Sequence, residues 1–198
     1  MGKLELLLAP WRSQSDCLTP AGDLLIRHWP SEGSGAYLHE LYAPIGSEQV
    51  ASLQDRFGFS LPVSYADFLN EHNGARLFLN TISLSGVIDE VRRSVDPNDA
   101  QPVSAIDTLE FFLVSHSERW AHGWRRIGEI TVNRQWSIEL NVVGTIAVVI
   151  DDRRSMFTDI WSFLTASVDL LAPSFAGEPQ RDIWDEIDDR LAISFERR

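Results

Sequence analysis

The chain has 198 residues, of which 44% are hydrophobic and 23% charged, a composition typical of globular proteins and unlike that of disordered chains. Its length fits one domain better than two. The formal net charge of −12 disfavours direct nucleic-acid binding, because an acidic surface repels the phosphate backbone. Cys17 is the only cysteine, so an intrachain disulfide is excluded.

Several features predict a protein of the cytoplasm without a membrane anchor. The longest uninterrupted apolar run spans residues 146–150, far short of the roughly 20 residues that cross a bilayer. The first residues contain one Lys and a very short apolar stretch, which does not match a secretory signal. A lone cysteine is typical of a reducing compartment.

Prolines and glycines divide the first part of the chain into short pieces. Residues 1–44 contain Pro10, Pro20 and Pro30, so we expect an N-terminal extension packed on the domain, with one strand at 24–29. A helix is predicted from Glu48, with Ser47 as its cap, and Gly58 is expected to end it.

Residues 61–74 predict a second helix. Pro62 suits its first turn, where a missing N–H costs nothing. Tyr65, Phe68, Leu69 and His72 follow the helical period and form one face. Asn73-Gly74 is expected to stop the helix in a left-handed turn. Residues 77–84 then alternate as one strand would.

The middle of the chain is predicted to form most of the sheet. Residues 87–108 are expected to be a loop with one strand near 103–106, and 111–114 a strand or a short helix. Strands are predicted at 127–132 and 136–140, joined by a turn at 133–135. The apolar segment 145–150 predicts a central strand covered on both faces.

Two helices are predicted after the strands. Thr158 is expected to cap the first, whose inner face has Ile160, Phe163, Leu164 and Leu171 and which Pro173 ends. The last, at about 181–191, has a strongly acidic face opposite an apolar stripe of Ile183, Trp184, Ile187 and Leu191. The order of elements favours an α+β fold, with helices on one face of a mostly antiparallel or mixed sheet.

The segment 61–74 resembles the signature of the SUKH superfamily. That signature consists of Leu-Pro, a Tyr three residues after the Pro, Phe-Leu and Asn-Gly, and it is matched by Leu61, Pro62, Tyr65, Phe68, Leu69, Asn73 and Gly74. The helix before it, the strand after it and the closing strands and helix also resemble the family. The resemblance covers 45–172, with the extension 1–44 and an acidic C-terminal helix in 173–198 outside it.

The resemblance implies a non-enzymatic, protein-binding module. Proteins of this kind include bacterial immunity proteins that neutralise polymorphic toxins, and a fungal regulator of cell-wall synthesis. The expected partner is a protein, such as a basic secreted toxin domain, and the chain is expected to be a monomer or a weak dimer. The alternatives are a regulatory or scaffold protein of the same superfamily without a toxin partner, or an uncharacterised hydrolase.

No motif in the sequence predicts catalysis, a cofactor or a metal site. A Gly-x-Ser-x-Gly elbow is absent, and the Gly-Ser-Gly at 33–35 has no phosphate-loop lysine. The spacing of His116, Glu118 and His122 fits neither a helical pair nor a known loop motif for a metal. A hydrolase would have to use carboxylates such as Asp151, for which a solvated turn is the favoured interpretation.

Two groups of side chains are candidates for binding a partner. The first is the acidic face of the last helix, which would attract a basic protein, although such a face is more commonly just solvated. Its members are Asp185, Glu186, Asp188 and Asp189. The second is the pair Trp120 and Trp124, which either forms an exposed anchor or covers a core edge, with core packing favoured.

Overall fold

The computed structural model describes every residue except 58–59, 88–122, 151–152, 178–182 and 197–198. In the described residues nine strands form one sheet in the order β1 to β9, and each strand pairs antiparallel with the next. The strands are β1 (Cys17–Leu18), β2 (Leu24–His28), β3 (Tyr37–Leu41), β4 (Ala75–Leu77), β5 (Ile82–Leu84), β6 (Trp124–Thr131), β7 (Gln135–Asn141), β8 (Ile146–Ile150) and β9 (Arg153–Phe157).

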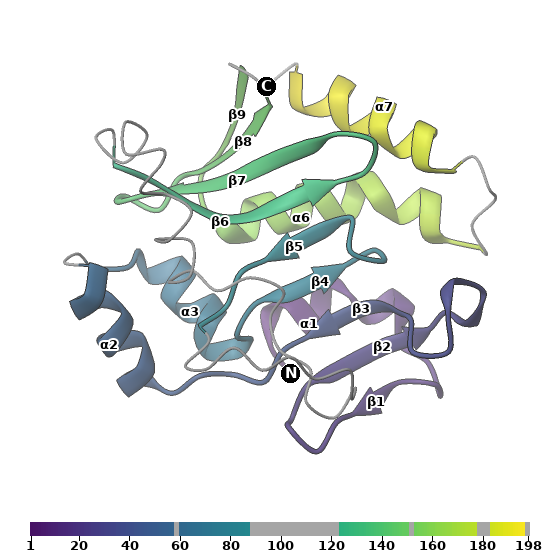
Figure 1. Cartoon of the computed structure of the whole chain (residues 1–198), viewed down its shortest axis with the longest axis horizontal. Helices are drawn as coiled ribbons and strands as arrows, with labels where there is room; N and C mark the ends of the chain where they lie inside the picture. The colour runs from purple at the N-terminus through teal and green to yellow at the C-terminus, as the bar shows by residue number, and fades with distance from the viewer. Residues whose placement is uncertain (58–59, 88–122, 151–152, 178–182, 197–198) are drawn as a thin grey trace.

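Helices complete an α+β fold, which confirms the predicted class. In Figure 1, α1 and α6 lie behind the strands, α7 runs beside β9, and α2 and α3 lie together at one side of the sheet. The α-helices are α1 (Lys3–Leu7), α2 (Ser47–Phe57), α3 (Val63–Glu71), α6 (Ile160–Leu171) and α7 (Ile183–Glu196); short 3-10 turns are η1 (Ala9–Trp11), η2 (Pro30–Glu32) and η5 (Ala172–Phe175).

The hydrophobic core lies between one face of the sheet and the helices. Successive residues of a strand point to opposite faces, so a single cross-strand row shows which face is buried. From β2 to β7 this row is fully or almost fully buried; it consists of Ile26, His39, Leu77, Ile82, Ile130 and Trp136. The cluster around it extends from Leu4 in α1 to Phe195 in α7, so both ends of the chain contribute to it.

The signature helix α3 forms as predicted, but its two ends differ in detail. Pro62 is the residue before the helix, where its carbonyl accepts the N–H groups of Tyr65 and Ala66, both at 3.0 Å. The helix ends at Glu71, and His72 is already extended, at φ −149°. The left-handed stop expected from Asn73-Gly74 is therefore wrong, because the chain leaves the helix before reaching it.

Asn73 and Gly74 instead join α3 to the sheet. The Asn73 side-chain amide donates to the carbonyl of Val87 at 2.8 Å, and its Oδ1 accepts the Val87 N–H at 2.6 Å. Gly74 has φ +90°, and a Cβ there would lie 2.6 Å from the carbonyl oxygen of Leu84. Gly86 approaches as closely, since its Cβ would lie 2.1 Å from the carbonyl oxygen of Asn73. Glycine is needed at 74 and 86 because the two backbone segments are in contact there.

The single strand predicted at 77–84 is two strands of a hairpin. Phe78, Leu79 and Asn80 all have positive φ, at 54°, 54° and 69°. Three consecutive left-handed residues reverse the chain within a few positions, so β4 and β5 pair with each other. The Phe78 N–H donates to Nδ1 of buried His39, and the Leu79 N–H donates to the carbonyl of Leu38. Tertiary contacts thus hold a turn that non-glycine residues rarely adopt.

The predicted hairpin and central strand are confirmed as β6, β7 and β8, and β6 begins earlier, at Trp124. Strand β9 was not predicted. Its burial alternates, with Ser155 and Phe157 inward. The sequence did not indicate this strand, because the inward Ser155 is polar and the exposed Met156 is apolar.

Two predicted helix caps are each displaced by one residue. The cap of α6 is Asp159 rather than Thr158, because the Asp159 carboxylate accepts the Ser162 N–H at 2.8 Å. In α2, Ser47 is the first helical residue, and the carbonyl of Gly46 accepts the N–H of Gln49 at 3.0 Å. The predictions for Gly58, 103–106 and 111–114 lie outside the described residues.

Candidate binding surface

The second face of the sheet carries a row of side chains that are polar except for Val149. Each member lies opposite the next on the neighbouring strand, from β3 to β9. The row consists of Glu40, Arg76, Ser83, Glu129, Ser137, Val149 and Arg154. It is chemically distinct from the apolar row on the core side.

Ion pairs join the charged members of this face. Arg76 pairs with Glu40 at 3.3 Å, and Arg154 pairs with buried Glu139 at 3.0 Å. Arg126 pairs with Glu129 at 2.6 Å, and the same carboxylate oxygen accepts the side-chain amide of Gln135 at 2.6 Å. Each carboxylate is thus matched by a nearby donor, which leaves this part of the sheet close to neutral.

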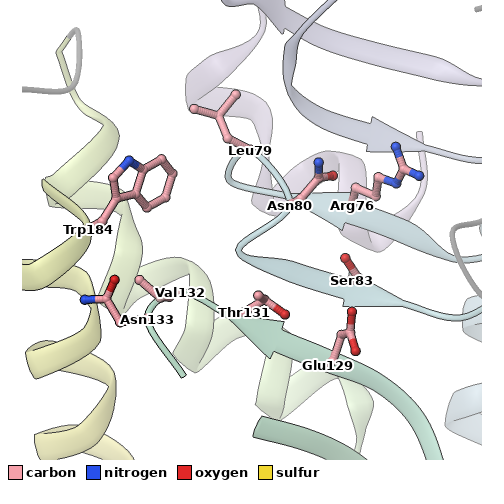
Figure 2. A pocket seen from close by; sticks show the side chains of 9 residues that line it. All are labelled: Arg76, Leu79, Asn80, Ser83, Glu129, Thr131, Val132, Asn133 and Trp184. Atoms are coloured by element: carbon pink, nitrogen blue, oxygen red, sulfur yellow. The ribbon is translucent and has the colours of Figure 1, made fainter. Parts of the chain in front are cut away.

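A groove of about 540 Å³ lies at the end of β4, β5 and β6. We call it the sheet-end groove. Figure 2 shows Trp184 on α7 pointing toward it, and Arg76, Ser83 and Glu129 side by side on neighbouring strands. Its lining residues are Arg76, Leu79, Asn80, Ser83, Glu129, Thr131, Val132, Asn133 and Trp184.

The described lining of the groove can be compared with what hydrolysis requires. Among the described lining residues there are two hydroxyl groups, of Ser83 and Thr131, and one carboxylate, Glu129, but no His or Cys that would act with them. In the described part of the chain no cluster of His, Cys, Asp and Glu could hold a metal ion. His116, Glu118, His122 and Asp151, considered for such chemistry, lie outside the described residues.

The acidic residues of α7 do not form one uniform exposed face. Asp188 is buried, 8% exposed, and pairs with Arg134 at 2.9 Å, so its placement on the solvated face was wrong. Asp185, Glu186 and Asp189 are exposed. Asp185 accepts a hydrogen bond from the Asn133 side chain at 2.7 Å.

Trp124 lies on the polar side of β6 and is half-buried, outside the core cluster. The guanidinium of Arg154 stacks over its ring at 4.9 Å from the centroid. Among the described residues, the ring of Trp124 is thus covered by a charged side chain. Trp120 lies outside the described residues.

The groove residues were not identified from the sequence. Trp184 was assigned to the apolar stripe of the last helix, and it does touch the core, with its ring 6.2 Å from that of Phe175. The alternation of Ser83 and Glu129 with buried neighbours was the available signal for a polar sheet face. No local pattern indicated that α7 would approach the tip of the β4–β5 hairpin.

The fold and this surface define a class of protein: an α+β module with a mostly polar sheet face and a groove at the end of the sheet. A sequence model of the SMI1 / KNR4 family (SUKH-1) matches residues 44–176. The chain belongs to this family. Membership supports, at the level of the family, a protein-binding role as an immunity or regulatory module.

No curated protein matches the chain. Among the helices that the structure describes, none has the length and apolar character needed to pass through a bilayer.

Proposed function

We propose that this protein is a non-enzymatic binding module that works in the cytoplasm as an immunity protein, neutralising the basic toxic domain of a bacterial polymorphic toxin. The observation that carries the proposal is membership of the SMI1 / KNR4 family over residues 44–176. The net charge of −12 supports a basic partner, because opposite charges speed association and favour the correct orientation.

The distribution of ion pairs supports the same choice of partner. Six arginines of the described residues pair with carboxylates: Arg12, Arg76, Arg126, Arg134, Arg154 and Arg190. Exposed Asp185 and Asp189 have no ion-pair partner within the described ranges. The unpaired charge that this face of α7 presents to a partner is therefore negative.

The proposed contact surface is the acidic face of α7 together with the tryptophans near the start of β6. It includes Asp185, Glu186 and Asp189, with Trp120 and Trp124 as aromatic anchors. Asp188 was also proposed, and its pairing with Arg134 gives it a structural task as well. Asp185 lies against Asn133 in the β6–β7 turn and Trp124 begins β6, so the described members of this surface lie at the two ends of one strand. Exposed carboxylates attract a basic partner, and aromatic rings are common anchors of protein interfaces.

The test is co-expression with the toxin domain encoded next to this protein's own gene. We expect the protein to restore growth of cells that express the toxin domain, and the two purified proteins to form a complex whose dissociation constant rises with salt. The control is a catalytically inactive toxin domain, which should bind equally well because an immunity protein recognises a surface.

Other outcomes identify the alternatives. A stable complex with a host enzyme and no effect on any toxin would replace the immunity role by a regulatory one. Assembly with further copies of itself, in place of the expected monomer or weak dimer, would indicate a scaffold. Turnover of a substrate that depends on Asp151 would support the hydrolase and overturn the proposal.

A further inference from the structure

The sheet-end groove has two chemically different ends. Leu79, Val132 and Trp184 supply apolar surface at the end next to α7. Arg76, Ser83 and Glu129 supply hydrogen-bonding groups at the other end, on three neighbouring strands. A ligand that fills the groove must therefore have an apolar part and a polar part.

The apolar end is built at a cost in backbone energy. Leu79 and Asn80 are at the tip of the β4–β5 hairpin with φ of 54° and 69°. The left-handed region is unfavourable for Leu79, while Asn80 tolerates it better. The strained tip brings the Leu79 side chain and exposed Asn80 to the groove, and such strain is characteristic of functional sites.

The charges at the groove favour a basic ligand. Arg76 is neutralised by Glu40 and Glu129 by Arg126, so the strands at the polar end carry little net charge. The α7 side differs, since Asp185 follows Trp184 directly and Asp189 lies one helical turn further on, both exposed. A second copy of this chain would bring its own carboxylates to this place, which opposes self-association there.

We infer that the sheet-end groove receives an extended segment of the partner protein in which an apolar side chain is followed closely by a Lys or Arg. The apolar side chain packs between Leu79, Val132 and Trp184, and the cation lies against Asp185 and Asp189. This inference rests on the proposed protein-binding function. Trp184 and both carboxylates lie outside the residues 44–176 that the family matches, so this site is a specificity feature of α7 in this chain.

The first experiment uses two matched synthetic peptides, acetyl-Gly-Phe-Gly-Lys-Gly-amide and the same peptide with Glu in place of Lys. Phe and Lys are two residues apart so that both side chains point to the same side of an extended chain. Binding is followed by NMR of ¹⁵N-labelled protein, with the indole N–H signal of Trp184 assigned from a Trp184→Phe variant. We expect the Lys peptide to shift this signal, and the Glu peptide to bind at least about tenfold more weakly.

Variants separate the contribution of the carboxylates to peptide binding from that of the apolar end of the groove. Asp185→Asn with Asp189→Asn should reduce the difference between the peptides to less than about twofold, because both variants remove charge and keep size. Trp184→Ala should weaken the binding of both peptides, and Val132→Ser repeats that test at a half-buried position of the β6–β7 turn if the first variant does not fold. Asp67→Asn is the matched control, since this exposed acid lies on α3. It should leave both affinities unchanged.

The outcomes separate this inference from the proposed function. Equal binding of both peptides, or a Trp184 signal that neither peptide moves, overturns the groove assignment. A partner that still binds the Asp185→Asn, Asp189→Asn and Trp184→Ala proteins with unchanged affinity also overturns it, while leaving the binding function intact. Failure of the unaltered protein to bind any partner overturns the proposed function, whatever the peptides show.

Discussion

At the scale of single residues, Asn73 shows how a signature position acts through tertiary contacts. Its side chain donates to and accepts from the backbone of Val87, at 2.8 Å and 2.6 Å. The side-chain amide therefore makes the same pair of hydrogen bonds that a backbone residue makes in a β-sheet, at the place where α3 leads into β4. Glycine at 74 and 86 allows the backbones to come this close.

We predict that Asn73→Ala lowers the free energy of unfolding by about 2 kcal/mol, because two hydrogen bonds to a part-buried backbone are lost together. Asn73→Asp keeps the acceptor for the Val87 N–H, so its free energy of unfolding should lie between those of the unaltered protein and Asn73→Ala. Urea titration measures the change. Asn70→Ala, at an exposed position of the same helix, is the control and should change stability by less than about 0.5 kcal/mol.

His39 links the fold to pH. Its ring is fully buried, and this desolvation lowers its pKa to about 3, with the charge of Arg27 acting in the same direction. Unfolded histidine has a pKa near 6.5, so between about pH 6.5 and 3 the unfolded chain binds a proton that the folded protein does not. The contribution of neutral, buried His39 to stability is therefore fully present above the pKa of the unfolded chain. This contribution falls as the pH drops below that pKa.

We predict that His39→Asn removes part of this pH dependence, since Asn keeps an acceptor for the Phe78 N–H and does not titrate. Between pH 7 and pH 5 the unaltered protein should lose about 2 kcal/mol more than the variant. Burial also lowers the pKa of His72, but His72 is present in both proteins and cancels in the comparison. Identical slopes of stability against pH would show that His39 is not buried as a neutral group.

At the scale of elements, α7 uses its acidic residues in two ways. Asp188 faces inward and holds the β6–β7 turn through Arg134, and Asp185 holds the same turn through Asn133. Glu186 pairs with Arg190 along the helix, and Asp189 is exposed. Helical periodicity placed all four carboxylates on one polar face, but the turn that meets α7 divides them.

We predict that Asp188→Asn destabilises the protein by about 1 to 2 kcal/mol, because it leaves Arg134 without the carboxylate at a part-buried pair. Asp189→Asn should change stability by less than about 0.5 kcal/mol. Urea unfolding at low salt measures both. A loss of similar size in both variants would mean that general charge on the helix, rather than the pair with Arg134, provides the stabilisation.

At the scale of the whole molecule, the folded unit extends beyond the residues that the family matches. Strand β3 pairs with β4, and β1 and β2 extend the sheet from it, although all three precede residue 44. The N-terminal part also fills the core with buried side chains: Leu4, Leu8, Trp11, Ile26, Leu38 and Leu41. The matched region alone would therefore expose the edge of β4 and a large apolar surface.

We predict that removing residues 1–43 abolishes cooperative unfolding. The shortened protein should bind the dye ANS and lose its near-ultraviolet circular dichroism, as loosely packed states do. Calorimetry of both proteins is the measurement, with the full chain as reference. A shortened protein with a sharp transition at the original temperature would show that the N-terminal part is an appendage.

The sequence by itself determined the elements that depend on neighbours along the chain. Helix α3, helix α6 and strands β6 to β8 follow from apolar periods, because these residues bury the same faces wherever the element packs. The signature 61–74 was enough to identify the family for the same reason. Composition and charge also indicated an acidic globular protein and disfavoured nucleic-acid binding before any contact was known.

Only the tertiary structure decided the features that join distant segments. The turn at Phe78 to Asn80 exists because His39 and Leu38 accept its N–H groups, and local propensity alone would not choose it. Asp188 is buried because Arg134 arrives from another hairpin. The sheet-end groove forms where Trp184 of α7 lies near the turn at Phe78 to Asn80 and the β6–β7 turn. These segments are far apart in the sequence, and no local pattern indicates that they meet.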